Sequence, residues 1–212
     1  MQFADIIYKN IPWRGEDGRE KTEGGEMSSK ISLEDGKKLL SMSRTVLEDF
    51  LRNRTKTMFS ESDVSESLKE NCGMFVTLHK KGYLRGCIGY IEGVMPLYQA
   101  VSDLTLASAF NDPRFPPVSI SEFSDIDIEI SVLTKPEKIS DPNLIKMGEH
   151  GVIVKKGHRQ GVFLPQVATE TGWSRDTFMD RLCIDKAGIS KDSWRDGTAE
   201  IFIFSVQLFS EK

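Results

Sequence analysis

The chain has no long apolar run and no obvious export signal. Of its 212 residues 39% are hydrophobic and 28% are charged, and no apolar stretch approaches the roughly 18 residues that a membrane span needs. The first residues, Met1-Gln2-Phe3-Ala4-Asp5, lack both the basic segment and the apolar segment of a secretory signal. The sequence therefore argues against a membrane protein and predicts a cytoplasmic one.

Cysteine and histidine are also scarce, with three of each. The cysteines are Cys72, Cys87 and Cys183, and the histidines are His79, His150 and His158. No C-x-x-C pair occurs, and an odd number of cysteines is a poor disulfide framework, so we expect three reduced thiols. No two histidines stand at a metal-ligand spacing, and we therefore expect no metal site.

Fingerprints of the common cofactor-binding and nucleic-acid-binding proteins are missing as well. The sequence contains no phosphate loop or dinucleotide motif, so no cofactor is predicted. Its net charge of -4 and pI near 5.5 give no general attraction for nucleic acid, which is bound mainly through phosphate neutralisation. Basic residues do occur at two expected hairpin tips, with Arg159 beside one of them, but solvated turn lysines are the commoner explanation.

The pattern of hydrophobic residues divides the chain into a leader and a folded region. Residues 1–29 carry four glycines among charged residues with no sustained period, which predicts a flexible leader. From Ser32 onward, apolar residues recur at helical spacing up to Leu51, and Ser32 with Asp35 is spaced like a helix-capping pair. Residues 30–212 are long enough for one sizeable core or two small ones.

A short frame, K-K-G-x-x-x-G, occurs at residues 80–86 and again at 155–161. Each copy is flanked by β-rich runs and followed by helical and strand patterns, which predicts hairpin, helix and strand twice. The two sets would divide residues 30–212 near residue 140. An internal duplication would make Val162 the counterpart of Cys87, although short apolar runs also produce such coincidences by chance.

The predicted strand at residues 83–90 holds most of the candidate functional residues. Alternation along a strand places Arg85, Cys87 and Gly89 on one face, and Gly86 on the other. A neighbouring cation favours the reactive thiolate, and glycines let a ligand or another backbone approach closely. The competing interpretation is a buried cysteine in a tightly packed strand.

A proline-rich loop, residues 111–117, follows the second predicted helix. Pro113 ends that helix and restricts Asp112. In such a stiff loop Asp112 and Arg114 could bind a carboxylate or phosphate, or could form an ion pair that closes a turn.

Three runs of the sequence carry a family resemblance. They are Leu84-Arg85-Gly86-Cys87-Ile88-Gly89, Asp112-Pro113-Arg114-Phe115-Pro116-Pro117 and Gly161-Val162-Phe163-Leu164-Pro165-Gln166-Val167. Through these runs the chain resembles the AMMECR family. This family is known in prokaryotes as AmmeMemoRadiSam system protein A. The resemblance runs from about Ser32 to Phe209. It implies an α+β fold of two subdomains, near residues 30–140 and 141–212, around mainly antiparallel sheet, with the LRGCIG run near the cleft between them. It also implies a pathway shared with a Memo-like protein and a radical SAM enzyme, without implying an activity.

Two functional hypotheses follow. The preferred one is a non-catalytic partner or small-molecule-binding component that uses a cleft near Arg85 and Cys87. The alternative is an enzyme in which Cys87 acts as nucleophile or group carrier while Arg85, Asp112 and Arg114 position an anionic substrate. Gly86, Gly89 and Gln166 complete the candidate ligand-binding set. The enzyme hypothesis lacks a clear general base; His79 would serve only if the hairpin register brought it to the thiol.

Overall fold

The computed structural model describes residues 7–8 and 31–212. Apart from residues 7–8, the predicted leader lies outside these described residues. The described chain divides into two compact units. One contains Leu133–Val206, and the other contains the described residues up to Val132 together with Gln207–Lys212. We refer to them as the central unit and the helical-sheet unit, respectively.

In the helical-sheet unit the chain begins with helix α1, Leu33–Asn53. The Ser32 hydroxyl accepts a hydrogen bond from the Asp35 backbone N–H at 3.0 Å, as the capping pattern predicts. Two acidic residues in the first turn complement the positive end of the helix dipole. The helix ends at Asn53, and the C-cap residue Arg54 adopts a left-handed conformation with φ 57°.

The LRGCIG run, residues 84–89, which we call the signature, lies in a β-hairpin of this unit. Strand β2, Gly73–Lys80, pairs antiparallel with β3, Tyr83–Tyr90. The turn between them, Lys81-Gly82, has positive φ at both residues, the geometry that two-residue hairpins favour. Strand β4, Ile126–Leu133, lies beside β2, and β1, Ile7–Tyr8, pairs parallel with the opposite edge of β3.

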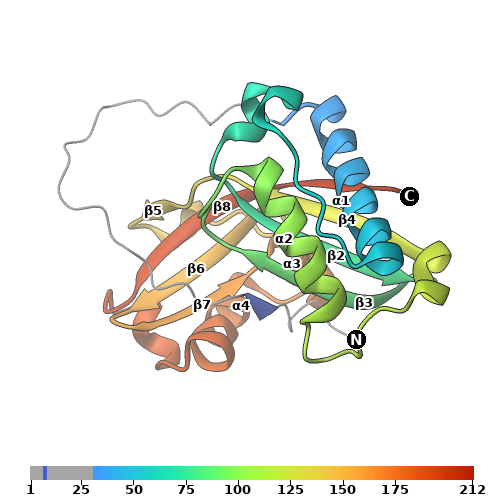
Figure 1. Cartoon of the computed structure of the whole chain (residues 1–212). Helices are drawn as coiled ribbons and strands as arrows, with labels where there is room; N and C mark the ends of the chain where they lie inside the picture. The colour runs from blue at the N-terminus through green and yellow to red at the C-terminus, as the bar shows by residue number, and fades with distance from the viewer. Residues whose placement is uncertain (1–6, 9–30) are drawn as a thin grey trace. The chain divides into compact units, whose positions relative to one another are not determined.

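Helix α2, Leu97–Phe110, packs with α1 against one face of this sheet (Figure 1). The buried core between helices and sheet is aliphatic, and its strand members occur at every second position. They include Met74, Val76, Leu78, Ile88, Ile126, Ile128, Ile130 and Val132. Short 3₁₀ helices connect the main elements at Glu61–Asp63, Glu66–Lys69 and Ile120–Asp125.

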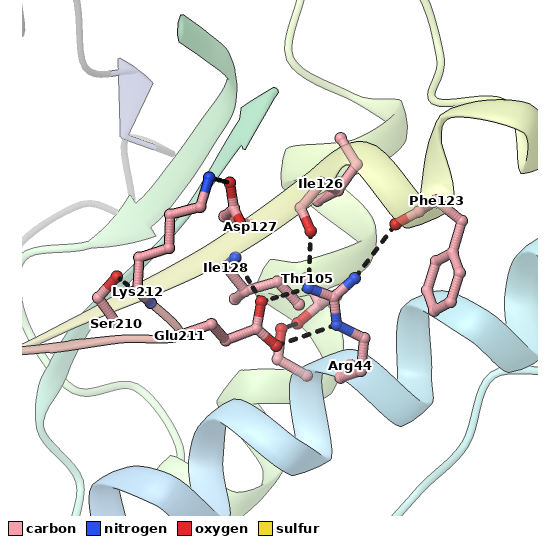
Figure 2. A network of polar contacts seen from close by, with 10 residues as sticks. Arg44, Thr105, Phe123, Ile126, Asp127, Ile128, Ser210, Glu211 and Lys212 are labelled. Atoms are coloured by element: carbon pink, nitrogen blue, oxygen red, sulfur yellow. Dashed lines mark hydrogen bonds and ion pairs between the residues drawn. The ribbon is translucent and has the colours of Figure 1, made fainter. Parts of the chain in front are cut away.

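The end of the chain is fastened to this unit by Arg44 of α1 and Glu211 (Figure 2). The Arg44 guanidinium donates to both Glu211 carboxylate oxygens and to the carbonyl oxygens of Phe123 and Ile126. Glu211 also accepts a hydrogen bond from the Ile128 N–H at 2.8 Å. One ion pair therefore links the first helix, strand β4 and the last residues of the chain.

The central unit is built on its own antiparallel strands. Strand β6, His150–Lys156, pairs with β7, Arg159–Phe163, through the turn Gly157-His158, and pairs on its other side with β8, Glu200–Ser210. The short strand β5, Glu137–Ile139, also pairs with β8.

Short helices complete the central unit. They are α3, Pro165–Thr171, α4, Arg175–Arg181, a π-helix at Leu182–Ala187, and 3₁₀ helices at Pro142–Leu144 and Lys191–Trp194. Its core is partly aromatic: the Phe163 ring lies 5.0 Å from Phe178 and 6.2 Å from Trp173, centroid to centroid. The central unit thus has a hydrophobic cluster of its own.

These elements confirm the predicted α+β class, with mainly antiparallel sheet and flanking helices. Both predicted hairpins are present. Within the described residues, no helix combines the length and the apolar character that crossing a membrane requires.

Candidate functional site

A β-bulge sets the position of Arg85. Leu78 is paired with Gly86, whereas the next residue of β2, His79, is paired with Leu84. Arg85 is therefore the extra residue of the bulge and has no residue directly opposite it. Bulges re-aim side chains next to functional sites, and here the local irregularity removes Arg85 from the simple alternation that the sequence suggests.

The Arg85 side chain forms an ion pair with Glu122 of the 3₁₀ helix before β4. Its Nε donates to Glu122 Oε1 at 3.0 Å and its Nη2 donates to Oε2 at 3.2 Å. Lys80 Nζ donates to the same carboxylate at 2.9 Å. The hydrogen bond from Arg85 is the largest influence that holds the pKa of Glu122 far below its usual range. Glu122 is therefore a carboxylate shared by two cations.

The remaining arm of the Arg85 guanidinium finds no acceptor among the described residues. Only 8% of Arg85 is exposed, and its Nη1 atom is buried without a hydrogen-bond partner within the described residues. Guanidinium N–H groups are strong donors that cannot be removed by deprotonation in proteins. A buried donor of this kind is costly unless an additional acceptor reaches it.

The thiol of Cys87 lies in a different environment. Cys87 is 1% exposed, and its sulfur lies 3.1 Å from the Thr77 hydroxyl, in agreement with the register that pairs Thr77 with Cys87. Burial raises the pKa of this thiol to about 11, against smaller lowering effects from Thr77 and Arg114. The residue opposite Cys87 is thus Thr77 rather than His79, and the nearby cation is Arg114.

Asp112 and Arg114 form an ion pair that holds the backbone of the signature strand. Arg114 donates to both oxygens of Asp112, at 2.9 and 2.7 Å. Asp112 Oδ2 accepts the Cys87 N–H at 2.8 Å, and Arg114 Nη2 donates to the Cys87 carbonyl oxygen at 3.3 Å. Burial opposes ionisation of Asp112, but the bonds from Arg114 and Cys87 hold its pKa below the usual value. The pair closes its loop and also holds both backbone groups of Cys87.

Phe115 brings the two arginines close to one aromatic surface. The guanidinium carbon of Arg85 lies 6.0 Å from the Phe115 ring centroid, and that of Arg114 lies 5.5 Å from it. Both distances are within the range of cation–π attraction. We call Arg85, Arg114, Phe115 and Glu122 the arginine cluster.

The two signature glycines are explained by packing. A Cβ atom at Gly86 would lie 2.1 Å from the Ser108 carbonyl oxygen of α2, and one at Gly89 would lie 2.2 Å from the Phe75 ring. Ser108 itself accepts the Ile88 N–H at 3.0 Å and donates to the Val76 carbonyl. Absence of a side chain at Gly86 lets α2 approach the strand, which accounts for this glycine without a ligand.

Gln166 belongs to the central unit, in the first turn of α3. Its Oε1 atom is buried and has no hydrogen-bond partner within the described residues. Its predicted part in ligand binding stays a prediction. Among the residues that the structure describes, no group of three or more His, Cys, Asp or Glu side chains could hold a metal ion.

Sequence reasoning missed three participants of the site: Thr77, Phe115 and Glu122. Phe115 was visible as part of the proline-rich loop, but no local pattern indicates which side chain it faces. Glu122 lies 37 positions from Arg85, so only the fold brings them together. Ser119 three residues before Glu122 is a detectable capping signal, and the Ser119 N–H does donate to Glu122 at 3.0 Å.

Comparison with known proteins identifies the family of this chain. The AMMECR1 family model matches residues 40–209. The chain belongs to the AMMECR1 family. The match covers both strands of the signature hairpin, the Asp112 loop and the whole of Leu133–Val206, so every candidate site residue lies inside the family domain.

Archaeal AMMECR1-family relatives resemble the chain over most of its length. A protein of Methanothermobacter thermautotrophicus is 41% identical over 187 residues, which is 85% of this chain and 96% of the relative. One from Methanosarcina acetivorans is 44% identical over 156 residues, covering 71% and 77% of the two chains.

A crystal structure of an uncharacterized protein from Pyrococcus horikoshii is also similar. It matches with a TM-score of 0.78 and 36% sequence identity, over 86% of this chain and 94% of that one. The names of these three proteins assign no activity, and the function of this chain therefore has to be inferred from its own residues.

Proposed function

We propose that this AMMECR1-family protein is a non-catalytic binding component, and that Arg85 in its arginine cluster binds an anionic group of a small molecule. The observation that carries the proposal is the Nη1 atom of Arg85, buried and without an acceptor in the described chain. Each of the other two nitrogens of this guanidinium already donates to Glu122. The Nη1 arm is therefore the one available for a ligand.

The charges around Arg85 favour an anionic acceptor over a neutral one. Lys80 and Arg85 share the single carboxylate of Glu122, which leaves one positive charge in this group. Asp112 and Arg114 neutralise each other. Hydrogen bonds between ionised partners are stronger than neutral ones, and guanidinium geometry suits carboxylate or phosphate oxygens.

The properties of Cys87 support binding rather than covalent chemistry. A thiol with a pKa raised to about 11 is almost entirely protonated near neutral pH, and the thiol form is a poor nucleophile. Its hydrogen-bond partner is Thr77, which is not a general base. No observation favours the alternative of a cysteine-dependent enzyme.

The proposal includes partners and a compartment. The family resemblance suggests that the protein acts with Memo-like and radical SAM proteins, to which a ligand-binding component could present or withhold a small molecule. A cytoplasmic location is consistent with three cysteines that remain thiols.

The binding proposal is tested by replacing Arg85 with lysine. Lysine retains a positive charge for Glu122 but lacks the second guanidinium arm. We expect acetate, malonate or inorganic phosphate, titrated against chloride at equal ionic strength, to raise the melting temperature of the wild-type protein. Arg85→Lys should weaken the affinity about tenfold, since one charge-assisted hydrogen bond contributes about 1.5 kcal/mol or more.

Arg52→Lys is the matched control, because Arg52 is an exposed α1 arginine that also pairs with a glutamate. It should leave anion binding unchanged. Equal affinities of the wild type and Arg85→Lys would contradict the proposal. So would no binding by the wild type of any of the three anions up to about 100 mM, a concentration that saturates a site of millimolar affinity.

A further inference from the structure

A second candidate binding site lies wholly inside the central unit. A pocket of about 400 Å³ is lined by Lys156, His158, Arg159, Ile189 and Ser190. Three of these residues belong to the end of the β6–β7 hairpin, and two belong to the segment after the π-helix. Three of the five side chains are basic, and one is aliphatic. Neither the family match nor the residues discussed above assign a role to this pocket.

The two walls of this pocket are held together by close backbone contacts. Gly161 of β7 packs so tightly on the π-helix that a Cβ atom there would lie 2.5 Å from the Ala187 backbone nitrogen. The helix ends at Gly188, which is left-handed with φ 63°, and the Ile189 N–H donates back to the Cys183 carbonyl at 2.9 Å. Arg159 Nη1 donates to the carbonyl oxygen of Gly188, the residue before Ile189. The basic hairpin end is thereby fixed against the Ile189 wall.

The basic groups of the pocket donate to neutral oxygens. Arg159 donates to a carbonyl, and Lys156 Nζ donates to the hydroxyls of Ser193 and Thr198, at 3.2 and 2.7 Å. The charge of Lys156 acts on the carboxylate of Asp196. The pKa of Asp196 is lowered chiefly by hydrogen bonds from Thr198, and the positive charge of Lys156 lowers it by a smaller amount. No ion pair of Arg159 with a carboxylate occurs within the described part of the chain. Among the residues that the structure describes, no carboxylate therefore neutralises the positive charge of Arg159.

From these observations we propose that the pocket binds a small organic phosphate. The phosphate group would accept hydrogen bonds from Arg159, with Lys156 adding positive potential and the His158 ring offering an N–H donor, and the organic part would lie against Ile189. Arginine suits phosphate oxygens by its planar fork of donors. A volume of about 400 Å³ is in the range of small-molecule sites, which combine apolar wall with a few polar groups. This site is independent of the one proposed at Arg85.

The test is calorimetric titration of the full chain with inorganic phosphate and with phenyl phosphate, in a chloride background of constant ionic strength. The wild type should bind both compounds, phenyl phosphate several-fold more tightly because of Ile189. Arg159→Gln should weaken the affinity for phenyl phosphate at least fivefold, whereas inorganic phosphate should keep the binding that the Arg85 site provides. Arg159 is exposed, so loss of its hydrogen bond to Gly188 should lower the melting temperature only slightly.

Two further variants separate this site from general charge effects and from Arg85. Lys138→Gln removes a positive charge from β5, elsewhere in the same unit, where Lys138 pairs with Glu200; it should bind phenyl phosphate as the wild type does. Arg85→Lys should also leave this affinity unchanged. Absence of phenyl phosphate binding, equal affinities of Arg159→Gln and wild type, or an equal loss in Lys138→Gln would each overturn the proposal.

Discussion

Replacement of Gly86 by alanine is expected to destabilise the protein by about 3 kcal/mol, the upper part of the usual range for forcing extra volume into a packed interior. The added Cβ would lie 2.1 Å from the Ser108 carbonyl oxygen. Relief would require α2 to move away from β3, and this would stretch the Ser108 hydrogen bonds to Ile88 and Val76. Urea denaturation measures the change in unfolding free energy.

Gly157→Ala provides the matched comparison for Gly86→Ala. Gly157 has nothing within 4 Å of a built Cβ but has φ 59°, so alanine there should cost only about 1 kcal/mol of backbone strain. A Gly86→Ala variant as stable as Gly157→Ala would show that contact between α2 and β3 is looser than described. The glycine would then need another explanation, such as close approach of a ligand.

Replacement of Glu122 by glutamine is expected to destabilise the protein by about 3 kcal/mol near neutral pH. The Arg85 and Glu122 side chains are 10% and 17% exposed, and removing one partner of a buried ion pair leaves the other charge uncompensated. Lys80 loses its carboxylate partner in the same variant. The exposed pair Glu48–Arg52 of α1 supplies the control, because Glu48→Gln should leave stability near the wild-type value.

The effect of Glu122→Gln should depend on pH in a defined direction. The folded-state pKa of Glu122 lies below the value of about 4.3 expected for an unfolded glutamate. Its contribution is therefore fully present above that value and is lost as the pH falls through the folded-state pKa. The stability difference between wild type and variant should accordingly shrink as the pH is lowered below about 4.3. A difference that stays constant down to pH 2 would refute the ion-pair account.

Regular elements of the fold could be predicted because their signals are local. The capping pair at Ser32 and Asp35 marked the start of α1, and the alternation of Ile126, Ile128 and Ile130 marked β4. Pro113 predicted that the second helix ends before it, and α2 does end at Phe110, three residues earlier. Each signal depends on residues within a few positions of one another, so a single sequence contains it.

The arrangement of the site could not be predicted, because it depends on register and long-range contacts. Simple alternation placed Arg85 beside the thiol, but the bulge makes Arg85 an extra residue and directs it to Glu122. His79 and Thr77 are two positions apart on β2, so alternation alone does not decide which of them faces the thiol. The register pairs Thr77 with Cys87, and His79 with Leu84. A shift of one residue in pairing changes every neighbour across a hairpin, and sequence pattern alone does not fix it.

The repeated frame illustrates the same limit. The first hairpin turns at Lys81-Gly82 and the second at Gly157-His158. In the shared letters K-K-G, the turn therefore begins at the second lysine in one hairpin and at the glycine in the other. Both hairpins were predicted correctly although their turns lie at different positions of the frame. Because the turns differ, the frame alone does not make Val162 the counterpart of Cys87.

The central claim is that the signature strand binds rather than reacts, and the alkylation rate of each cysteine in the native protein tests it most directly. Iodoacetamide labelling from about pH 6 to 10, with the modified peptides located by mass spectrometry, would report all three thiols at once. The partly exposed Cys72 should label first. Cys87 should resist labelling until the protein unfolds, because it is buried and its pKa is raised to about 11. Labelling of Cys87 faster than Cys72, with a midpoint below the usual value of about 8.5, would contradict the account and make Cys87 a nucleophile.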